Sequence, residues 1–279
     1  MKVLNRIARL LSPAPVSRTP RANRARPRVE QLDQRLVPTV TFGSYAAGTY
    51  AYNSASHAWR QITSARAVNM DEGADGTLFA TYSTGTYRYD YYSNVWTKLS
   101  SLKATALSAA NDNTLFASYG DGTWEKDGGG WHKMTSAIAS HLAAVADNYF
   151  YGTFSAGTYK YNGGWTQITT AVANVMDASS GGTLYASYST GTWRYAGGWT
   201  KLTSAVAYDI AAASSSVFYA SYSTGTWKYN GGFTQLTTAV ANQLSADSTT
   251  QLVASYGTGT WVYNGGWSKI TTAQADLLA

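Results

Sequence analysis

The sequence predicts an all-β fold in which seven similar units close into a ring. The tripeptide Gly-Thr-aromatic recurs seven times at steps of 34 to 37 residues, and a fixed period in this range indicates a repeat architecture. The 22 tyrosines, 10 tryptophans and 26 glycines accompany only 13% charged residues, which is typical of β-rich chains with tight turns. Each repeat alternates with a period of two, whereas a helical solenoid needs apolar residues at 3.6 spacing.

The repeat at 183–216 shows the expected order of strands. Three strands, at 184–188, 192–195 and 199–203, are separated by glycine turns, and an alanine-rich fourth strand follows at 205–213. Small apolar residues in the fourth strand suit a crowded, buried position. Four short antiparallel strands per unit, repeated radially, define the blade of a β-propeller. We therefore predict a seven-bladed β-propeller of four-stranded blades.

The order of strand types predicts how the ring closes. The array begins near Val40 with the second strand of a blade and ends at Ala279 with an innermost strand. We expect residues 274–278 to pair with residues 40–44, so that one blade contains both ends of the array and no sheet edge stays open. The predicted repeats span about 39–76, 77–113, 114–148, 149–182, 183–216, 217–250 and 251–279.

Residues 1–38 share nothing with the repeats. They carry nine Lys or Arg and two Asp or Glu, a net charge of +7, whereas residues 39–279 carry 12 and 13, a net charge of −1, so the tail accounts for the net charge of +6 of the whole chain. This distribution predicts no basic face on the repeats and no nucleic-acid partner. Residues 28–38 contain Val29, Glu30, Leu32, Arg35 and Pro38, with Asp33 between them. With Asp33 in place of the usual glutamate, this pattern resembles the sorting segment near the N-terminus of many exported planctomycete proteins, which implies export; a disordered, solvated basic tail is the alternative.

The titratable residues indicate no catalytic or metal site. The chain has no cysteine, and its three histidines, His57, His132 and His141, occupy unrelated positions in their repeats. The sequence therefore predicts a protein that is not an enzyme and holds no cofactor or metal. No apolar run is long enough for a membrane span. Four aspartates on or beside the predicted innermost strands are expected to be solvated channel residues, because other repeats carry Ser, Ala, Val or Gln there: Asp71, Asp177, Asp209 and Asp276.

All ten tryptophans fall at two positions of the repeat. Large aromatic side chains at either position fill the widening space between neighbouring blades, or they leave ring faces exposed on which sugars stack. Both interpretations stay open. Four tryptophans follow the Gly-Thr turn and six open the outer strand: Trp124, Trp193, Trp227 and Trp261, and Trp59, Trp96, Trp131, Trp165, Trp199 and Trp267.

The loops of the predicted ring divide into two faces. The Gly-Thr hairpins and the loops that cross between blades share one face and are nearly identical in all repeats; we call it the uniform face. The other loops differ in length and sequence and form the variable face. The uniformity reflects either duplication or seven similar weak sites that bind a repetitive glycan together. The predicted ligand-binding residues are Tyr87, Trp124, Tyr159, Trp193, Trp227, Trp261, Thr84, Thr190 and Thr224.

Two motifs carry a resemblance to a known family. The outer-strand motif Gly-Trp-Thr-Gln-Ile at 164–168 and the motif Gly-Thr-Leu-Tyr at 182–185 resemble those of tectonin and tachylectin-like propellers, and the resemblance spans about residues 39–279. That family usually has fewer than seven blades. Its members of known activity bind glycans, so the resemblance implies lectin-like binding. We expect a monomeric, multivalent carbohydrate-binding module outside the bacterial cell or at its envelope; a rigid protein-interaction scaffold is the alternative, and an enzyme is the third possibility.

Overall fold

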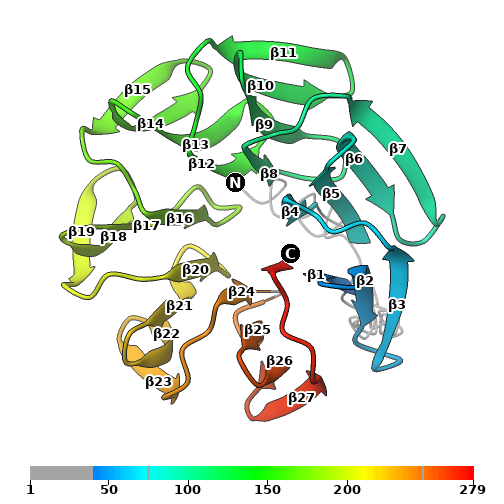
Figure 1. Ribbon diagram of the computed structural model, residues 1–279. Helices are drawn as coiled ribbons and strands as arrows, with labels where there is room; N and C mark the ends of the chain where they lie inside the picture. Colours follow the sequence, from blue (N-terminus) through cyan, green and yellow to red (C-terminus); the bar gives the residue numbers. More distant parts are fainter. Residues whose placement is uncertain (1–39, 74–75, 247) are drawn as a thin grey trace, which may run out of the picture. The chain divides into compact units, whose positions relative to one another are not determined.

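The computed structural model describes residues 40–73, 76–246 and 248–279. These residues form seven four-stranded antiparallel sheets set around a common centre, which confirms the predicted seven-bladed β-propeller (Figure 1). Among them there is no helix long and apolar enough to cross a membrane. The predicted tail at 1–38, with its sorting segment, lies outside the described residues.

Each blade contributes one strand to each of four concentric positions. Blade 1 consists of β28 and β1–β3, and blades 2 to 7 take the strands from β4 to β27 four at a time. The innermost strands are β28 (Leu277–Leu278), β4 (Asn69–Glu72), β8 (Ala106–Ala109), β12 (His141–Ala146), β16 (Val175–Ala178), β20 (Asp209–Ala212) and β24 (Gln243–Ser245). The second strands are β1 (Val40–Tyr45), β5 (Thr77–Tyr82), β9 (Leu115–Tyr119), β13 (Tyr149–Phe154), β17 (Leu184–Tyr188), β21 (Val217–Tyr222) and β25 (Gln251–Tyr256).

The two outer positions complete the blades. The third strands are β2 (Gly48–Asn53), β6 (Gly85–Asp90), β10 (Gly122–Asp127), β14 (Gly157–Asn162), β18 (Gly191–Tyr195), β22 (Gly225–Asn230) and β26 (Gly259–Asn264). The outermost strands are β3 (Ala58–Thr63), β7 (Val95–Ser100), β11 (Gly130–Thr135), β15 (Trp165–Thr169), β19 (Trp199–Thr203), β23 (Phe233–Thr237) and β27 (Trp267–Thr271).

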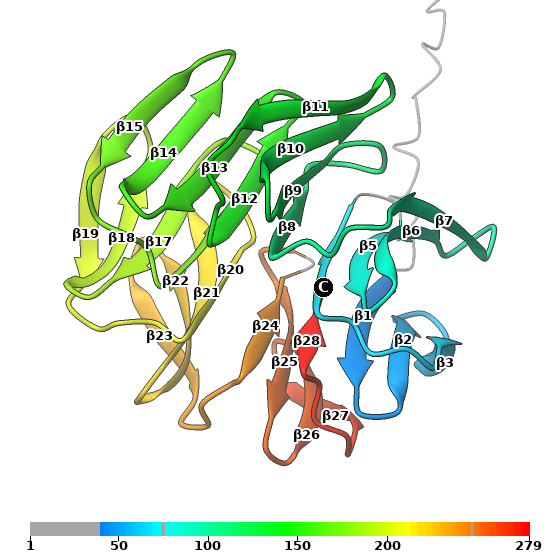
Figure 2. The ribbon, with the colours of Figure 1, turned by 45° about the horizontal axis from the view of Figure 1, so that its top comes forward.

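The ring closes through β28, as the sequence predicts, but by a shorter strand. Figure 2 shows β28 beside β1, and their register pairs Gly43 with Leu278 and Ser44 with Leu277. The backbones of Phe42 and Ala279 add two hydrogen bonds, of 2.7 and 3.0 Å. Residues 274–276 were expected to belong to this strand, which comprises only Leu277 and Leu278. They instead belong to the loop that crosses from the rim to the centre.

The same correction applies to the other innermost strands. In blade 5 the hydroxyl of Thr203 accepts the N–H of Ala205 at 3.1 Å, which folds the chain into a turn at the start of the crossing loop. The carbonyl of Ala205 then accepts the hydroxyl of Thr192 at 2.9 Å. The backbone of the crossing loop is therefore partly satisfied by side chains, and the next innermost strand, β20, begins only at Asp209.

The Gly-Thr motif builds the junction between a hairpin and its crossing loop. Gly191 has φ of +124°, and a Cβ added there would lie 2.2 Å from the carbonyl oxygen of Thr203. Only glycine fits this approach of two backbones. The next residue, Thr192, is fully buried. In all seven blades this threonine donates to a crossing-loop carbonyl; the donors are Thr49, Thr86, Thr123, Thr158, Thr192, Thr226 and Thr260.

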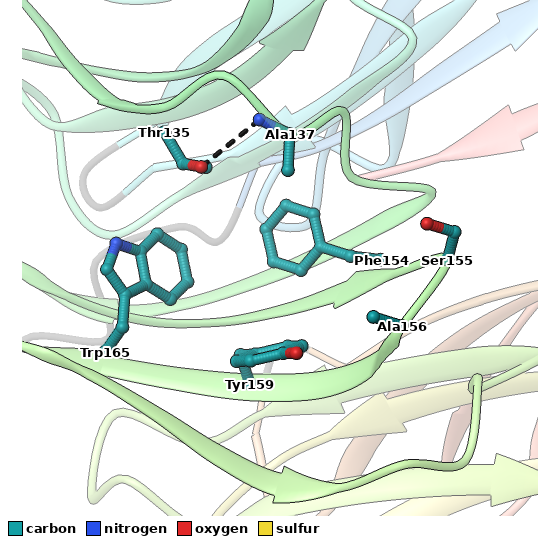
Figure 3. Close-up of a pocket in the computed structure, with 7 residues that line it drawn as sticks. All are labelled: Thr135, Ala137, Phe154, Ser155, Ala156, Tyr159 and Trp165. Carbon is teal, nitrogen blue, oxygen red and sulfur yellow. Dashed lines mark hydrogen bonds between the residues drawn. The ribbon is translucent and has the colours of Figure 1, made fainter.

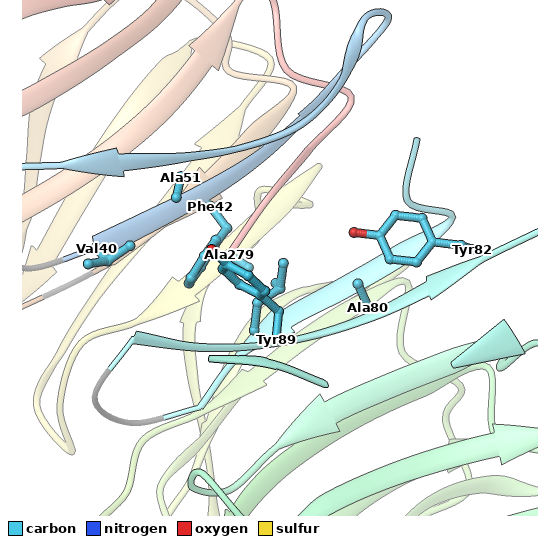
Figure 4. Close-up of a cluster of buried hydrophobic side chains, with 8 residues drawn as sticks. Val40, Phe42, Ala51, Ala80, Tyr82, Tyr89 and Ala279 are labelled. Carbon is cyan, nitrogen blue, oxygen red and sulfur yellow. The ribbon is translucent and has the colours of Figure 1, made fainter. Parts of the chain in front are cut away.

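The core is divided into clusters of buried side chains, one at each junction between blades. Figure 4 shows the cluster between blades 1 and 2, where Phe42 meets Tyr89 edge-on with ring centroids 6.3 Å apart. Leu78, Ala80 and Ala279 complete the contact. Because each blade buries side chains against its neighbour in this way, each of the seven junctions adds to the stability of the ring.

The outer-strand tryptophans lock each blade to the one before it. The indole N–H of Trp199 in blade 5 donates to the carbonyl of Ile168 in blade 4 at 2.9 Å. Six junctions share this bond; blade 6 carries Phe233 and makes none. The tryptophans are Trp59, Trp96, Trp131, Trp165, Trp199 and Trp267.

A candidate ligand pocket on the uniform face

The structure places the predicted ligand-binding residues around the uniform face, one set in each of blades 2 to 7, rather than in one cluster. The six aromatic side chains are half-buried, and each packs against the core of a blade junction. The three threonines, Thr84, Thr190 and Thr224, are exposed. The aromatic residues therefore have a packing role, whatever else they do.

A polar side chain from the outermost strand lies opposite each of these aromatics. In blade 5 Trp193 pairs with Lys201, and the lysine Nζ lies 5.5 Å from the ring centroid, within cation–π distance. Blades 2, 3 and 7 repeat the arrangement with Lys98, Lys133 and Lys269. Blades 1, 4 and 6 carry a glutamine, whose amide donates to a hairpin carbonyl: Gln61, Gln167 and Gln235.

Two of the predicted threonines are engaged within their own hairpins. The hydroxyl of Thr84 lies 3.0 Å from that of Tyr87. The hydroxyl of Thr224 accepts the indole N–H of Trp227 at 3.2 Å. These contacts orient the aromatic rings and reduce the polar groups free for a ligand.

In blade 4 a pocket of about 270 Å³ opens beside the hairpin. Figure 3 shows the rings of Phe154, Tyr159 and Trp165 around it. Trp165 is 37% exposed. The remaining lining residues come from the blade 4 hairpin and from the preceding crossing loop with its strand end: Ser155 and Ala156, and Thr135 and Ala137.

Blade 4 departs from the repeat at three positions that line this pocket. Phe154 replaces the tyrosine that ends this strand in the other six blades. Ala156 stands where Thr84, Thr190 and Thr224 stand, so Tyr159 lacks the threonine hydroxyl that contacts the aromatic residue in blades 2 and 6. Tyr159 is itself smaller than the tryptophan of blades 3, 5, 6 and 7. Blade 1 shares the alanine and the third-strand tyrosine, but it keeps Tyr45.

Sequence reasoning identified Tyr159 and missed the rest of this pocket. Phe154, Ser155, Trp165 and the crossing-loop residues were not among the predicted ligand-binding residues. The sequence does mark these residues, because Phe154 and Ala156 differ from the residues at the same positions in most other repeats. Residues that recur in every repeat do not reveal such a difference.

Three of the four channel aspartates, which the sequence predicted to be solvated, accept hydrogen bonds from the next blade. Asp177 in blade 5 accepts the N–H of Ala212 in blade 6 at 2.7 Å, and Asp209 in blade 6 accepts that of Leu244 in blade 7 at 2.7 Å. Burial raises the pKa of each carboxyl to about 7. Burial also raises the pKa of Asp71, which accepts from Ser108 and Ala109. These side chains tie innermost strands together.

The fourth channel aspartate and the histidines have local partners. Asp276 is half exposed and forms an ion pair of 2.7 Å with Arg66. The ring of His57 contacts the hydroxyl of Tyr52, and that of His132 contacts Asp127, both at 3.2 Å. Across the ranges described, no group of three or more His, Asp or Glu side chains could hold a metal ion.

The variable face carries a second distinctive feature, at blades 1 and 2. Their turns at 54–57 and 91–94 are longer than those of the later blades. Arg60 bridges them: its Nη2 donates to the hydroxyl of Tyr89 at 2.7 Å, and its guanidinium lies 4.4 Å from the ring centroid of Tyr91. Tyr92, next in the turn, is 57% exposed.

No protein-family model matches the sequence, and no curated protein matches it. Solved structures share the fold. One is the extracellular domain of a putative one-component system from B. thetaiotaomicron, with 12% identity, TM-score 0.54 and coverage of 76% of this chain; this chain spans only 33% of that domain. Another is YCF48 bound to D1 peptide, with 10% identity, TM-score 0.54 and coverage of 73% and 80%.

An ancestral GH74 enzyme is also similar, with 14% identity, TM-score 0.56 and coverage of 83% of this chain and 44% of the enzyme. At these identities the likeness establishes the propeller fold and nothing about a shared ligand or activity. The fold hosts both binding proteins and enzymes, so the site has to carry the functional argument.

Proposed function

We propose that this protein is a non-catalytic carbohydrate-binding module, located outside the cell or at its envelope, whose principal site is the pocket beside the blade 4 hairpin. The observation that supports this is the set of three rings, Phe154, Tyr159 and Trp165, around one solvent-accessible cavity. Aromatic walls with a few polar groups are the usual composition of small-molecule sites. The apolar faces of a sugar ring stack on such walls, while its hydroxyls bond to the rim.

The volume of the pocket and its lack of charged lining residues limit the kind of ligand that it can bind. Its volume of about 270 Å³ is just below the usual range of roughly 300–1,000 Å³ for ligand pockets, which suits one sugar ring. No charged side chain is among its lining residues. We therefore expect an uncharged monosaccharide unit, presented at the end or branch of a glycan. The equivalent aromatics of the other blades would add weaker contacts on a repetitive glycan.

The test is a glycan array probed with the full chain and with Tyr159→Trp. This substitution places in blade 4 the residue found at the same position in blade 5, so the fold should hold while the pocket is filled. The matched control is Tyr87→Trp, the same change in blade 2. We expect binding of one sugar class by the native chain and the control, with at least a tenfold loss for Tyr159→Trp. Equal binding by all three proteins would refute the pocket as the site.

A protein-interaction scaffold is the second candidate, supported by the long turns of blades 1 and 2. Tyr92 is 57% exposed and Val95 52% exposed beside the cation–π pair of Arg60 and Tyr91. Exposed tyrosine next to an ordered arginine is the composition of interface hot spots. If this surface binds a protein, Tyr92→Ser should abolish capture of a purified partner while leaving sugar binding unchanged.

A further inference from the structure

The crossing loops of the uniform face present an unusual row of exposed aliphatic side chains. Four consecutive loops carry a β-branched residue at the same position: Ile138, Val172, Val206 and Val240, with exposures of 47, 46, 36 and 38%. The other three loops carry Arg66, Lys103 and Gln274 there. Leu102, beside Lys103, is 53% exposed. This loop position is therefore aliphatic, basic or amide in every blade, and never acidic.

Basic side chains gather on the same face. The lysines opposite the Gly-Thr aromatics lie two residues before the end of each outermost strand, in the half from which the crossing loop leaves: Lys98, Lys133, Lys201 and Lys269. On the described hairpins, crossing loops and adjoining strand ends, the acidic residues are Asp121, 3.9 Å from Lys133; Asp276, paired with Arg66; and Asp209, which accepts the backbone N–H groups of Ile210 and Leu244. The near-zero net charge of the repeats thus hides a basic uniform face, which the sequence analysis did not predict.

We propose that the uniform face docks on an anionic lipid bilayer. Lysine and arginine near such a surface are attracted by its negative potential. Aliphatic tips beside them enter the boundary between head groups and acyl chains, as apolar residues of interfacial segments do. The ammonium groups of Lys201 and Lys269 lie 5.5 and 5.1 Å from the centroids of their partner rings, and both side chains are exposed, so each charge is accessible to a head group from the uniform face.

The aliphatic tips favour a bilayer over a soluble polyanion. An acidic polysaccharide or a nucleic acid could bind the lysines. Neither would account for the exposed aliphatic side chains of Ile138 and Val172. Single-stranded nucleic acid also needs open aromatic faces for its bases. Here lysine or glutamine lies opposite each ring. The bilayer proposal does not depend on sugar binding, because none of the four lysines or four β-branched residues lines the blade 4 pocket.

The first experiment compares two double variants of the full chain that lose the same charge. Lys201→Gln with Lys269→Gln alters the uniform face and uses the residue that blades 1, 4 and 6 carry at that position. Lys160→Gln with Lys228→Gln alters the opposite half of the blades. The basic tail is identical in both, so its own attraction to lipid cancels.

Partitioning is measured by sedimentation with vesicles of phosphatidylcholine, with and without phosphatidylglycerol. We expect each uniform-face lysine to be worth about fivefold, so the first double variant should bind anionic vesicles about 25-fold more weakly, with a change of under threefold for the second. Equal losses in the two variants would overturn the proposal and assign binding to net charge or to the tail. Binding to heparin or to single-stranded DNA without binding to vesicles would overturn it in favour of a soluble polyanion.

A second experiment tests insertion directly. Because the chain has no cysteine, Val172→Cys and Ser180→Cys each give a unique site for an environment-sensitive fluorophore, on the uniform and variable faces respectively. We expect anionic vesicles to increase and blue-shift the emission at position 172 only. No change at position 172, or equal changes at both positions, would contradict docking through the uniform face.

Discussion

The junction between blades 3 and 4 and the junction between blades 4 and 5 are built from the same repeat but differ beside their hairpins. The first holds Phe154 and Tyr159 around an open pocket. The second holds Tyr188 and Trp193, both packed into the cluster between blades 4 and 5. The shared Gly-Thr turn and outer-strand tryptophan hold both junctions together. The comparison teaches that the regular residues build the scaffold, whereas the proposed site lies where blade 4 departs from the repeat.

The largest effect should come from the scaffold itself. Gly191→Ala forces a Cβ to within 2.2 Å of the Thr203 carbonyl at φ of +124°, and we expect a loss of about 3 kcal/mol in unfolding free energy. Gly197→Ala is the matched control in the same blade, because its φ is +82° but nothing lies within 4 Å of the added Cβ. It should cost about 1 kcal/mol. Urea denaturation measures both, and equal losses would mean that the turn tolerates the close approach.

The next largest effect should be a pH dependence of the unfolding free energy that comes from the aspartates of the innermost strands. Blade 5 has Asp177 where the register of blade 4 places Ala143. Burial raises the pKa of Asp177 and Asp209 to about 7, from an ordinary value of 3.8. The folded chain therefore keeps protons that the unfolded chain releases between about pH 4 and 7, and the stability that these protons confer is lost as the pH rises through 7.

We expect the unfolding free energy to fall by about 1–3 kcal/mol per carboxyl across that range. Asp177→Asn combined with Asp209→Asn should flatten the profile. Denaturation at a series of pH values checks the slope, and an unchanged slope in the double variant would show that other groups titrate there.

A smaller effect should come from the link between neighbouring blades. Trp199→Phe removes the 2.9 Å bond to the Ile168 carbonyl and part of the ring, for an expected loss of about 1–2 kcal/mol. Phe233→Trp adds the missing member of the set in blade 6 and should stabilise by up to about 1 kcal/mol. If Phe233→Trp destabilises instead, the blade 5–6 junction is packed too tightly for the larger ring.

The scaffold was predictable because the residues that build each blade recur in every repeat. Period-two alternation, glycine turns and seven occurrences of Gly-Thr each indicate the same blade, and the strand offset at Val40 and Ala279 predicts closure. The pocket was not predictable in the same way. Tyr159 looked equivalent to Trp193 in the sequence, and its different surroundings depend on Phe154 and Ala156 together with a crossing loop from blade 3. The backbone bonds of Asp177 and the basic uniform face likewise depend on neighbours across blades.

The most direct test of the central claim transplants the blade 4 departures into blade 5. The variant carries Tyr188→Phe, Thr190→Ala and Trp193→Tyr, and titration calorimetry with the sugar identified on the array gives its number of sites. If departures from the repeat create the site, the variant should bind one more sugar per molecule than the native chain, with similar affinity. An unchanged number of sites in a folded variant would contradict the account.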